Sequence, residues 1–226
     1  MQLYSNICSY FDDKRISTLL LIENNNNTSS LYEELLEMGF RHNGSYFYKP
    51  MCESCRECIP IRIEASKFEA NKNQRRTLRK NIDIIVKLNK HPVKNDAKFE
   101  LFRKYMKNKH NNESDENNIY IFNSLYDSYS RVLEVCYYID NKIIGISIID
   151  ETDKGLSSNY FFYDTDYLNR RLGVFSILKE IYLTKDMKKD YYYLGYYIEK
   201  NKKMSYKNSF KPSEIMTEDG WVDNTL

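Results

Sequence analysis

Three cysteines at one repeated spacing are the residues of this sequence most suited to chemistry. Cys52, Cys55 and Cys58 form a C-x2-C-x2-C triplet in the loop-like stretch 49–62. Two cysteines at this spacing can bind a tetrahedral metal ion, and three occur in iron–sulfur loops whose fourth ligand lies elsewhere. Cys8 is the natural fourth ligand, because it lies in the same N-terminal part. The spacing therefore predicts a zinc or iron–sulfur site, with packed free thiols as the alternative.

Two basic clusters are suited to binding phosphate groups. The first lies in a predicted helix, where cations within two turns would neutralise a nucleic acid backbone. Its members are Arg75, Arg76, Arg79 and Lys80. The second mixes cations with aromatic rings that can stack on bases, and comprises Lys202, Lys203, Lys207, Lys211, Tyr206 and Phe210. Because the formal net charge is only +2, polyanion binding depends on such clusters, and a solvated surface is the alternative for each.

Other common catalytic signatures are missing from the sequence. The three histidines lie in unrelated contexts, and neither a G-x-S-x-G nor a Walker-type motif occurs, which argues against hydrolases and kinases. No apolar run approaches the roughly 20 residues that span a bilayer, and the N-terminus lacks a secretory pattern. We therefore expect a cytoplasmic protein without a membrane partner, whose cysteines act as thiols or ligands rather than as disulfides.

The chain must place these residues on regular elements. Its 226 residues, 42% of them hydrophobic, suffice for one large domain or two small ones. Amphipathic periodicity predicts helices in 29–40, 71–81, 96–110 and 169–187. Runs rich in β-formers predict strands in 45–50, 59–68, 82–89, 131–140, 142–150, 155–164 and 191–198. Residues 111–118 and the segment that begins at Met204 are predicted to be irregular.

The order of several motifs resembles one protein family. The stretches "GFRHNGSYFYKPMCESCRECIPIRI", "YYYLGYYI" and "KKMSYKNSFKPSEI" look like those of the aminoacyl-tRNA–protein transferases of the N-degron pathway. They most resemble the bacterial aspartate/glutamate leucyltransferases, and are similar to the eukaryotic arginyl-tRNA–protein transferases. The resemblance covers nearly the whole chain.

This resemblance implies an α+β fold. A GNAT-like acyltransferase domain, with a mixed sheet and a crossover helix, would follow a smaller cysteine-containing N-terminal lobe. The predicted strand–helix–strand order over 155–198 agrees, because it implies a parallel pair joined by a crossover helix. We expect the lobe, with the cysteine loop and the basic helix, at residues 1–90 and the transferase domain at residues 91–226.

The resemblance also implies a reaction. Leucine would move from leucyl-tRNA to a protein that begins with Asp or Glu, so the expected partners are leucyl-tRNA and such proteins. The acceptor α-amine, with a free pKa of about 7.7–8.0, needs only modest base help. An ester is already activated, so positioning and oxyanion stabilisation can supply much of the rate. No cofactor is required for the chemistry. The metal or iron–sulfur site known among eukaryotic relatives carries over best to Cys8 and Cys55.

A GNAT-like domain would hold the reacting ester between the strands predicted at 155–164 and 191–198. Tyr160 and Asp164 are expected to handle the amine. Tyr196 is expected to donate to the carbonyl oxygen or to the leaving hydroxyl. Core packing is the alternative for each tyrosine.

Cations are expected to bind both substrates. The acidic side chain of the acceptor needs one, because an unpaired buried carboxylate is costly. The candidates are Arg76, Lys203 and Lys207, with Arg62 as a less favoured choice. The candidates for the tRNA acceptor stem are Arg75, Arg79, Lys80 and Arg171. A solvated surface is the alternative for the lysines.

Three other functions compete with leucyl transfer. Arginyl transfer uses the same scaffold and differs in the donor pocket, which would be lined by carboxylates instead of apolar groups. A non-catalytic module that binds tRNA or degrons is the second. An acetyl-CoA acetyltransferase is disfavoured, because the chain has only 7 glycines and lacks a glycine-rich phosphate loop. The sequence does not predict an oligomeric state.

Overall fold

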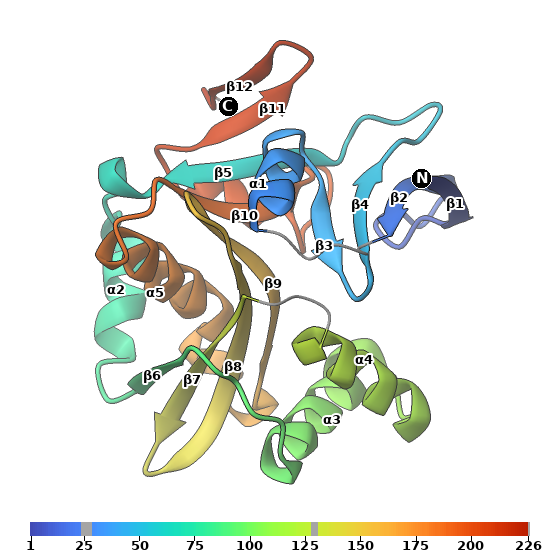
Figure 1. Ribbon diagram of the computed structural model, residues 1–226. Helices are drawn as coiled ribbons and strands as arrows, with labels where there is room; N and C mark the ends of the chain where they lie inside the picture. Colours follow the sequence, from blue (N-terminus) through green and yellow to red (C-terminus); the bar gives the residue numbers. More distant parts are fainter. Residues whose placement is uncertain (24–28, 128–130, 226) are drawn as a thin grey trace.

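One large mixed sheet runs through the molecule (Figure 1). The structure is a computed structural model that describes residues 1–23, 29–127 and 131–225. The large sheet has the strand order β12-β11-β5-β10-β9-β8-β7-β6. Its strands are β5 (Ile59–Glu64), β6 (Ile85–Asn89), β7 (Val132–Ile139), β8 (Lys142–Glu151), β9 (Gly155–Tyr163), β10 (Tyr191–Tyr197), β11 (Glu214–Thr217) and β12 (Gly220–Asp223).

A smaller antiparallel sheet lies beside it, with the order β1-β2-β4-β3. Its strands are β1 (Gln2–Ile7), β2 (Ile16–Glu23), β3 (Arg41–Asn43) and β4 (Tyr46–Pro50). The helix α1 (Ser29–Glu37) connects β2 to β3. Gly39 ends this helix in the left-handed region, at φ +82°, so that the chain turns directly into β3.

Helices cover both faces of the large sheet (Figure 1). The helices α2 (Lys72–Lys80) and α5 (Leu172–Asp186) lie on one face, and α3 (Asp96–His110) and α4 (Asp115–Asp127) lie on the other with α1. Each face has its own apolar core: Leu156, Phe175 and Leu178 belong to the first, and Phe47 and Phe102 to the second. The described residues also form three short 3-10 helices: η1 (Ala65–Lys67), η2 (Thr165–Arg170) and η3 (Ser205–Ser209).

The strands β9 and β10 form a parallel pair joined by α5, and they separate after a short start. Their pairing covers Gly155–Ser157 and Tyr191–Tyr193. Beyond it, β9 continues beside β8 and β10 continues beside β5. Each strand is irregular near this point: Asn159 is an extra residue opposite β8, and Gly195 adopts φ +94°. This separating pair confirms the predicted α+β, GNAT-like fold, and we call the space between the two strands the β9–β10 gap.

Local sequence signals explain where several elements begin and end. Asn71 and Gln74 form a reciprocal capping box at the start of α2. Asp140 and Asn141 both have positive φ, as the two-residue hairpin turn between β7 and β8 requires. These elements, and α3, α5, β4, β5, β9 and β10, fall where the sequence predicted them.

Other elements differ from the predictions. The sequence did not indicate β1 and β2, because β1 is exposed along its length and shows no alternation of buried and exposed residues. The helix α4 begins at Asp115, inside the segment predicted to be a loop. The C-terminal segment forms η3 and the hairpin β11–β12, whose short strands depend on pairing with β5.

The expected domain boundary at residue 90 does not coincide with a boundary between sheets. The strands β5 and β6, which precede it, both belong to the large sheet. The basic helix α2 also packs on α5, from the C-terminal part. Over the described stretches of chain, no helix combines the length and the apolar character needed to cross a bilayer.

Gly155 should be required at the paired start of β9 and β10. A Cβ there would lie 2.8 Å from the Tyr193 ring and 3.0 Å from the Tyr191 carbonyl oxygen. We expect Gly155→Ala to lower the free energy of unfolding by about 1–3 kcal/mol, because the strands must move apart. Urea unfolding followed by circular dichroism measures this change.

Gly173 supplies the matched control for that experiment. A Cβ at this position in α5 meets no atom of the described structure within 4 Å. Gly173→Ala should be neutral or stabilise by up to about 1 kcal/mol, because alanine favours helix. Equal stability of the two variants would contradict the tight approach of β9 and β10.

Candidate active site at the β9–β10 gap

Two buried cations occupy the β9–β10 gap. Arg41 donates through Nη1 to the Tyr193 carbonyl oxygen at 3.2 Å and through Nη2 to the Ser158 carbonyl oxygen. Lys207 donates to the Tyr196 carbonyl oxygen at 2.9 Å. The two cations are only 7% and 9% exposed. They satisfy carbonyl groups of strands that no longer pair with each other, and buried carbonyl groups require such partners.

The end of α1 brings Arg41 into this position. The amides of Gly39 and Phe40 bond back to α1, and β3 starts at once with Arg41. A side chain at Gly39 would collide with Met216 and Pro60, so glycine is needed for the close approach as well as for its positive φ. Arg41 was not among the predicted site residues. The only signal for it was its place in the "GFRHNG" motif, directly after the helix-ending glycine.

Burial changes the protonation of Lys207. Burial first, and then repulsion by the nearby Arg41, lower the pKa of the Lys207 amine to about 7. Gly195 allows the approach, since a Cβ there would lie 3.2 Å from Lys207 Nζ. A substantial fraction of Lys207 is therefore neutral near pH 7 and able to accept a proton. From the sequence, Lys207 was expected to bind the carboxylate of the acceptor. The structure places Lys207 in the gap, where its lowered pKa suits a proton acceptor better than a carboxylate partner.

The predicted tyrosines lie on different sides of the gap. The Tyr196 hydroxyl donates to the carbonyl oxygens of Gly39 at 3.0 Å and Tyr48 at 3.2 Å, and burial raises its pKa well above the usual value. It therefore joins β10 to the small sheet. The Tyr160 hydroxyl lies 3.6 Å from the Met106 sulfur on α3, and burial raises its pKa to about 12. The Tyr196 hydroxyl, predicted to donate to the substrate, thus donates to backbone carbonyls in this structure. The Tyr160 hydroxyl, predicted to handle the amine, is a poor proton acceptor.

Asp164 forms part of an ion-paired cluster beyond the end of β9. Burial alone would raise its pKa, but hydrogen bonds from Lys104 and Lys142 outweigh burial and lower the pKa to about 2. The carboxylate also accepts from the Asp166 amide and so caps η2. A carboxylate with so low a pKa is a weak base. These contacts do not support the predicted role of Asp164 in handling the amine.

The other predicted cations fall into separate places. Arg75, Arg76, Arg79 and Lys80 are exposed on α2. Arg171 is exposed at the start of α5, the helix on which α2 packs. Lys203 is exposed just before η3. The structure thus does not bring Arg76 and Lys203 into the gap with Lys207.

Arg62 is committed to a packed cluster next to β10. Its guanidinium bonds to Glu37 and Glu214 at 2.6 Å each. It also lies 3.7 Å from the centre of the Tyr191 ring and 4.3 Å from that of Trp221. Such stacking and pairing favour a structural role for Arg62.

The four cysteines of the predicted metal site gather in one region. Burial, followed by the proximity of Cys52, Cys8 and Cys55, raises the pKa of the Cys58 thiol to about 12. Arg15 donates to the Cys55 sulfur, and the Thr18 amide to the Cys52 sulfur, each at 3.5 Å. Across the described residues, however, no three His, Cys, Asp or Glu side chains are arranged to hold a metal ion. The donor types fit zinc or iron–sulfur, whereas the described side chains are not arranged around one common ion position.

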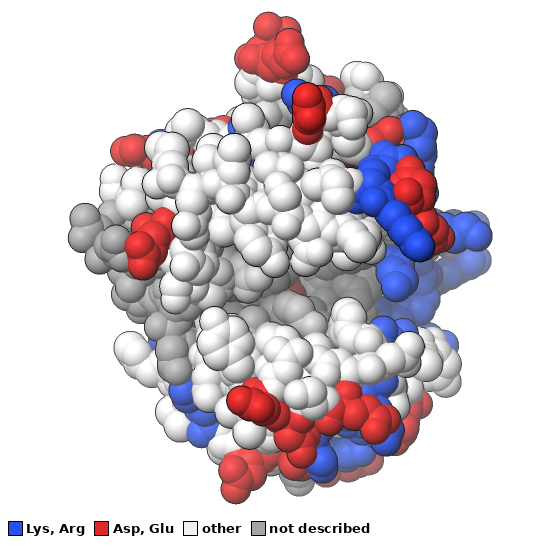
Figure 2. Space-filling view, turned by 90° about the vertical axis from the view of Figure 1, so that its right-hand side faces the viewer, with Lys and Arg blue, Asp and Glu red and all other residues white. Residues whose placement is uncertain are grey.

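The cysteine loop also forms a wall of the gap. Cys58 is close enough to Tyr48, Tyr196 and Lys207 to influence the pKa of each. Lys200, just after β10, pairs with Glu57 of this loop at 2.6 Å. Figure 2 shows Lys and Arg side chains, with some Asp and Glu among them, gathered at the right-hand edge of one face of the molecule, which a hollow crosses. The cysteine loop, which follows the small N-terminal sheet, thus lies next to the candidate active site.

The separating strands, the crossover helix and the two cations together define an acyltransferase-type site. Family models described as "Arginine-tRNA-protein transferase, C terminus" and "N terminus" match residues 97–217 and 6–76. The chain therefore belongs to the family of aminoacyl-tRNA–protein transferases.

Individual relatives cover nearly the whole chain. It is 32% identical over 221 residues to an aspartate/glutamate leucyltransferase of Hahella chejuensis, covering 95% of this chain and 92% of that protein. It is 34% identical over 225 residues to one of Pseudomonas putida, with the same coverage. A solved C-terminal domain, described as that of a lysylphosphatidylglycerol synthetase from Agrobacterium fabrum, shares the fold. Its TM-score is 0.52 at 11% identity, over 75% of this chain and 52% of that one.

Lys207 should make stability depend on pH. Its pKa is about 7 in the folded protein and about 10.4 when unfolded. Between these values the unfolded chain binds more protons, so stability should rise with pH by at most about 1.4 kcal/mol per pH unit from this group. Lys207→Met should remove that rise in urea unfolding measured from pH 6 to 10.

Lys203→Met is the control, because Lys203 lies in the same segment but is exposed. It should keep the wild-type slope of stability against pH. A Lys207→Met variant with the same slope as Lys203→Met would show that Lys207 is not a buried, easily deprotonated amine.

Proposed function

We propose that this protein transfers leucine from leucyl-tRNA to the N-terminal Asp or Glu of other proteins. Relatives named aspartate/glutamate leucyltransferases match it over 95% of its length. The observation that carries the proposal is the β9–β10 gap, with one permanently charged side chain and one readily deprotonated amine. Because aminoacyl-tRNA is a cytosolic co-substrate, the proposal places the protein in the cytoplasm.

The tRNA would approach the face that carries α2 and α5. The exposed arginines of α2 and Arg171 lie on this face, and the N-terminus of α5 presents backbone amides that favour phosphate. Neutralising several phosphates would supply sequence-independent affinity. The 3′ end with its leucine ester would then enter the gap between β9 and β10.

The acceptor carboxylate would pair with Arg41. The guanidinium remains charged at any relevant pH and has five N–H donors, of which two make the backbone contacts in the gap. An acidic side chain bound there would be largely desolvated, so that a charged partner is essential. Arg41 thus replaces Arg76 in the role predicted from the sequence.

The reaction needs one proton acceptor, and Lys207 is suited to it. The acceptor nitrogen attacks the ester carbonyl carbon, a C–N bond forms, and the C–O bond to the tRNA ribose breaks. Neutral Lys207 takes a proton from the attacking nitrogen. The protonated Lys207 amine then gives this proton to the leaving ribose oxygen, which ends as a hydroxyl. The products are an amide and uncharged tRNA, so ATP is not consumed. Arg41 and Lys207 thus have different tasks: Arg41 stays charged and binds the carboxylate, whereas Lys207 can lose its proton and act as the base.

A buried carboxylate bears on the choice between leucine and arginine. Glu180 of α5 lies against β10, where its oxygens accept from Ser147 at 2.6 Å and Tyr192 at 2.5 Å. Because both carboxylate oxygens of Glu180 already accept these bonds, Glu180 is poorly placed to bind the guanidinium of an arginine carried by arginyl-tRNA. We therefore favour leucine as the donor amino acid. Zinc or an iron–sulfur cluster on the four cysteines stays a prediction, which elemental analysis of anaerobically purified protein would test.

Labelled aminoacyl-tRNA tests the proposed function directly. Purified protein is incubated with leucyl- or arginyl-tRNA and peptides that begin with Asp, Glu or Ala. We expect labelled leucine on the Asp and Glu peptides only. Labelled arginine would support the arginyl alternative, and tRNA binding without transfer would support a non-catalytic module.

Arg41→Gln should impair use of acidic acceptors. Loss of a charged hydrogen bond of about 1.5–3 kcal/mol corresponds to a drop of about 10- to 150-fold in kcat/KM for the Asp peptide. Arg76→Gln on α2 is the matched control and should leave the KM for this peptide nearly unchanged. If Arg76→Gln raises that KM and Arg41→Gln does not, the acceptor carboxylate binds elsewhere.

A further inference from the structure

We propose that Asp150 is a positioning residue that holds Arg41 and the irregular part of β9 in register across the gap. This inference rests on the proposed function. Asp150 lies in β8 and is fully buried. It touches neither the gap cations nor a substrate in the described contacts, so that it would act through other residues.

Side chains from three elements meet on the Asp150 carboxylate. It lies 3.0 Å from His42 Nδ1 on β3 and accepts from the Tyr32 hydroxyl on α1 at 3.0 Å. Asn159 on β9 donates to both carboxylate oxygens, at 3.4 and 3.3 Å. The Tyr32 hydroxyl also contacts the Ser157 hydroxyl at 2.8 Å. One carboxylate therefore connects β8 to β3, α1 and β9.

Two of these partners lie next to the ends of the Arg41 contact. His42 follows Arg41 in β3, and Asn159 follows Ser158, whose carbonyl oxygen accepts from Arg41. Neighbouring side chains of a strand point to opposite faces. Because Asp150 holds the His42 side chain on one face of β3, the Arg41 side chain must project from the opposite face of β3. Asp150 thus sets both the donor and the acceptor of that contact.

Asn159 needs such an anchor because it interrupts the ladder between β8 and β9. Ile148 pairs with Tyr160 and Ile149 with Ser158, so that Asn159 is the inserted residue. An inserted residue bends its strand and re-aims the side chains beside it. The contacts with Asp150 hold this bulge in one position, at the level where β9 leaves β10.

The energetic cost of the network indicates a specific purpose. Its members lie beside an apolar core that includes Phe47, Phe162 and Ile146. A buried carboxylate is costly unless its partners are complete and well placed, and apolar residues of similar size often fill such space as well or better. The directional hydrogen bonds of the Asp150 carboxylate fix the positions of its partners, which apolar packing alone would not do.

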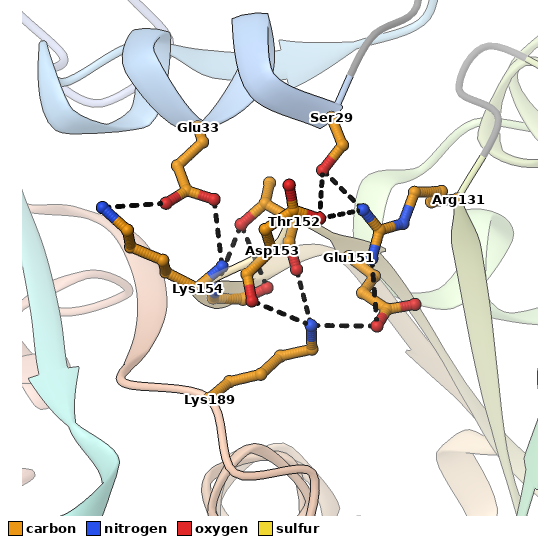
Figure 3. Close-up of polar contacts among 9 residues, drawn as sticks. Ser29, Glu33, Arg131, Glu151, Thr152, Asp153, Lys154 and Lys189 are labelled. Carbon is orange, nitrogen blue, oxygen red and sulfur yellow. Dashed lines mark hydrogen bonds and ion pairs between the residues drawn. The ribbon is translucent and has the colours of Figure 1, made fainter.

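The attachment of α1 does not depend on this network alone. Figure 3 shows a second set of polar contacts between α1 and the turn from β8 to β9. Glu33 accepts from the Lys154 amide at 3.0 Å, and Ser29 donates to Asp153 at 3.2 Å. Lys189 closes the turn by bonding to the Thr152 carbonyl oxygen at 2.6 Å. Changes at Asp150 should therefore alter the gap while α1 stays in place.

A double-mutant cycle tests the inference. Asp150→Asn keeps the size of the side chain but loses its charge and one acceptor. We expect kcat/KM for the Asp peptide to fall about 10-fold or more in the wild-type background. In the Arg41→Gln background the same change should cost less than 3-fold, because Asp150 acts through Arg41. Additive losses in the two backgrounds would overturn the proposal.

Two further measurements make the result decisive. Glu33→Gln, which removes the charge that faces Lys154 on the same helix, should retain nearly full activity. Hydrogen exchange of the β3 and β9 amides should become faster in Asp150→Asn and stay unchanged in Glu33→Gln. This second readout needs no catalysis, so it separates a failure of the positioning role from a failure of the proposed function.

Asn159→Ala is the alternative variant should Asp150→Asn fail to fold. If Asp150→Asn is unfolded by circular dichroism, Asn159→Ala replaces it in the cycle, since it removes only the bulge anchor. Non-additivity with Arg41→Gln again supports the inference. Additivity, or unchanged hydrogen exchange in β9, refutes it.

Discussion

The candidate active site depends on backbone carbonyl groups at the point where β9 and β10 separate. Tyr193 is the last paired residue of β10, and Ser158 and Tyr196 lie beyond the pairing. Their carbonyls need donors, because a buried and unsatisfied acceptor costs about 1–3 kcal/mol. Arg41 and Lys207 supply these donors. The separation that makes room for a substrate is therefore the same feature that draws two cations into the interior.

Placing two cations together in a buried space then determines their chemistry. The guanidinium keeps its charge, so the lysine responds to burial and to repulsion, and its pKa falls to about 7. A charged anchor for an acid and a neutral acceptor for a proton arise side by side. Neither the ion-paired Asp164 nor the buried hydroxyls of Tyr160 and Tyr196 can take the second task.

The N-terminal part of the chain forms its own small sheet and also contributes to the site. Its β3 carries Arg41, and its cysteine loop lies beside Tyr196 and Lys207. The Tyr196 hydroxyl bonds back to Gly39 and Tyr48, so that each part fixes the other.

Sequence patterns predicted the helices α1, α2, α3 and α5, most strands and the parallel β9–β10 pair, because these follow from local periodicity and from motif order. They also named Lys207 as a candidate site residue. Only the tertiary structure showed that Arg41 enters the gap, that Asp164 pairs with Lys104 and Lys142, and that Arg76 is exposed on α2 whereas Lys207 is buried. It also revealed β1 and β11, whose short or exposed strands exist through pairing. The reason is physical: protonation, burial and strand pairing depend on neighbours distant in the chain, which a local pattern does not contain.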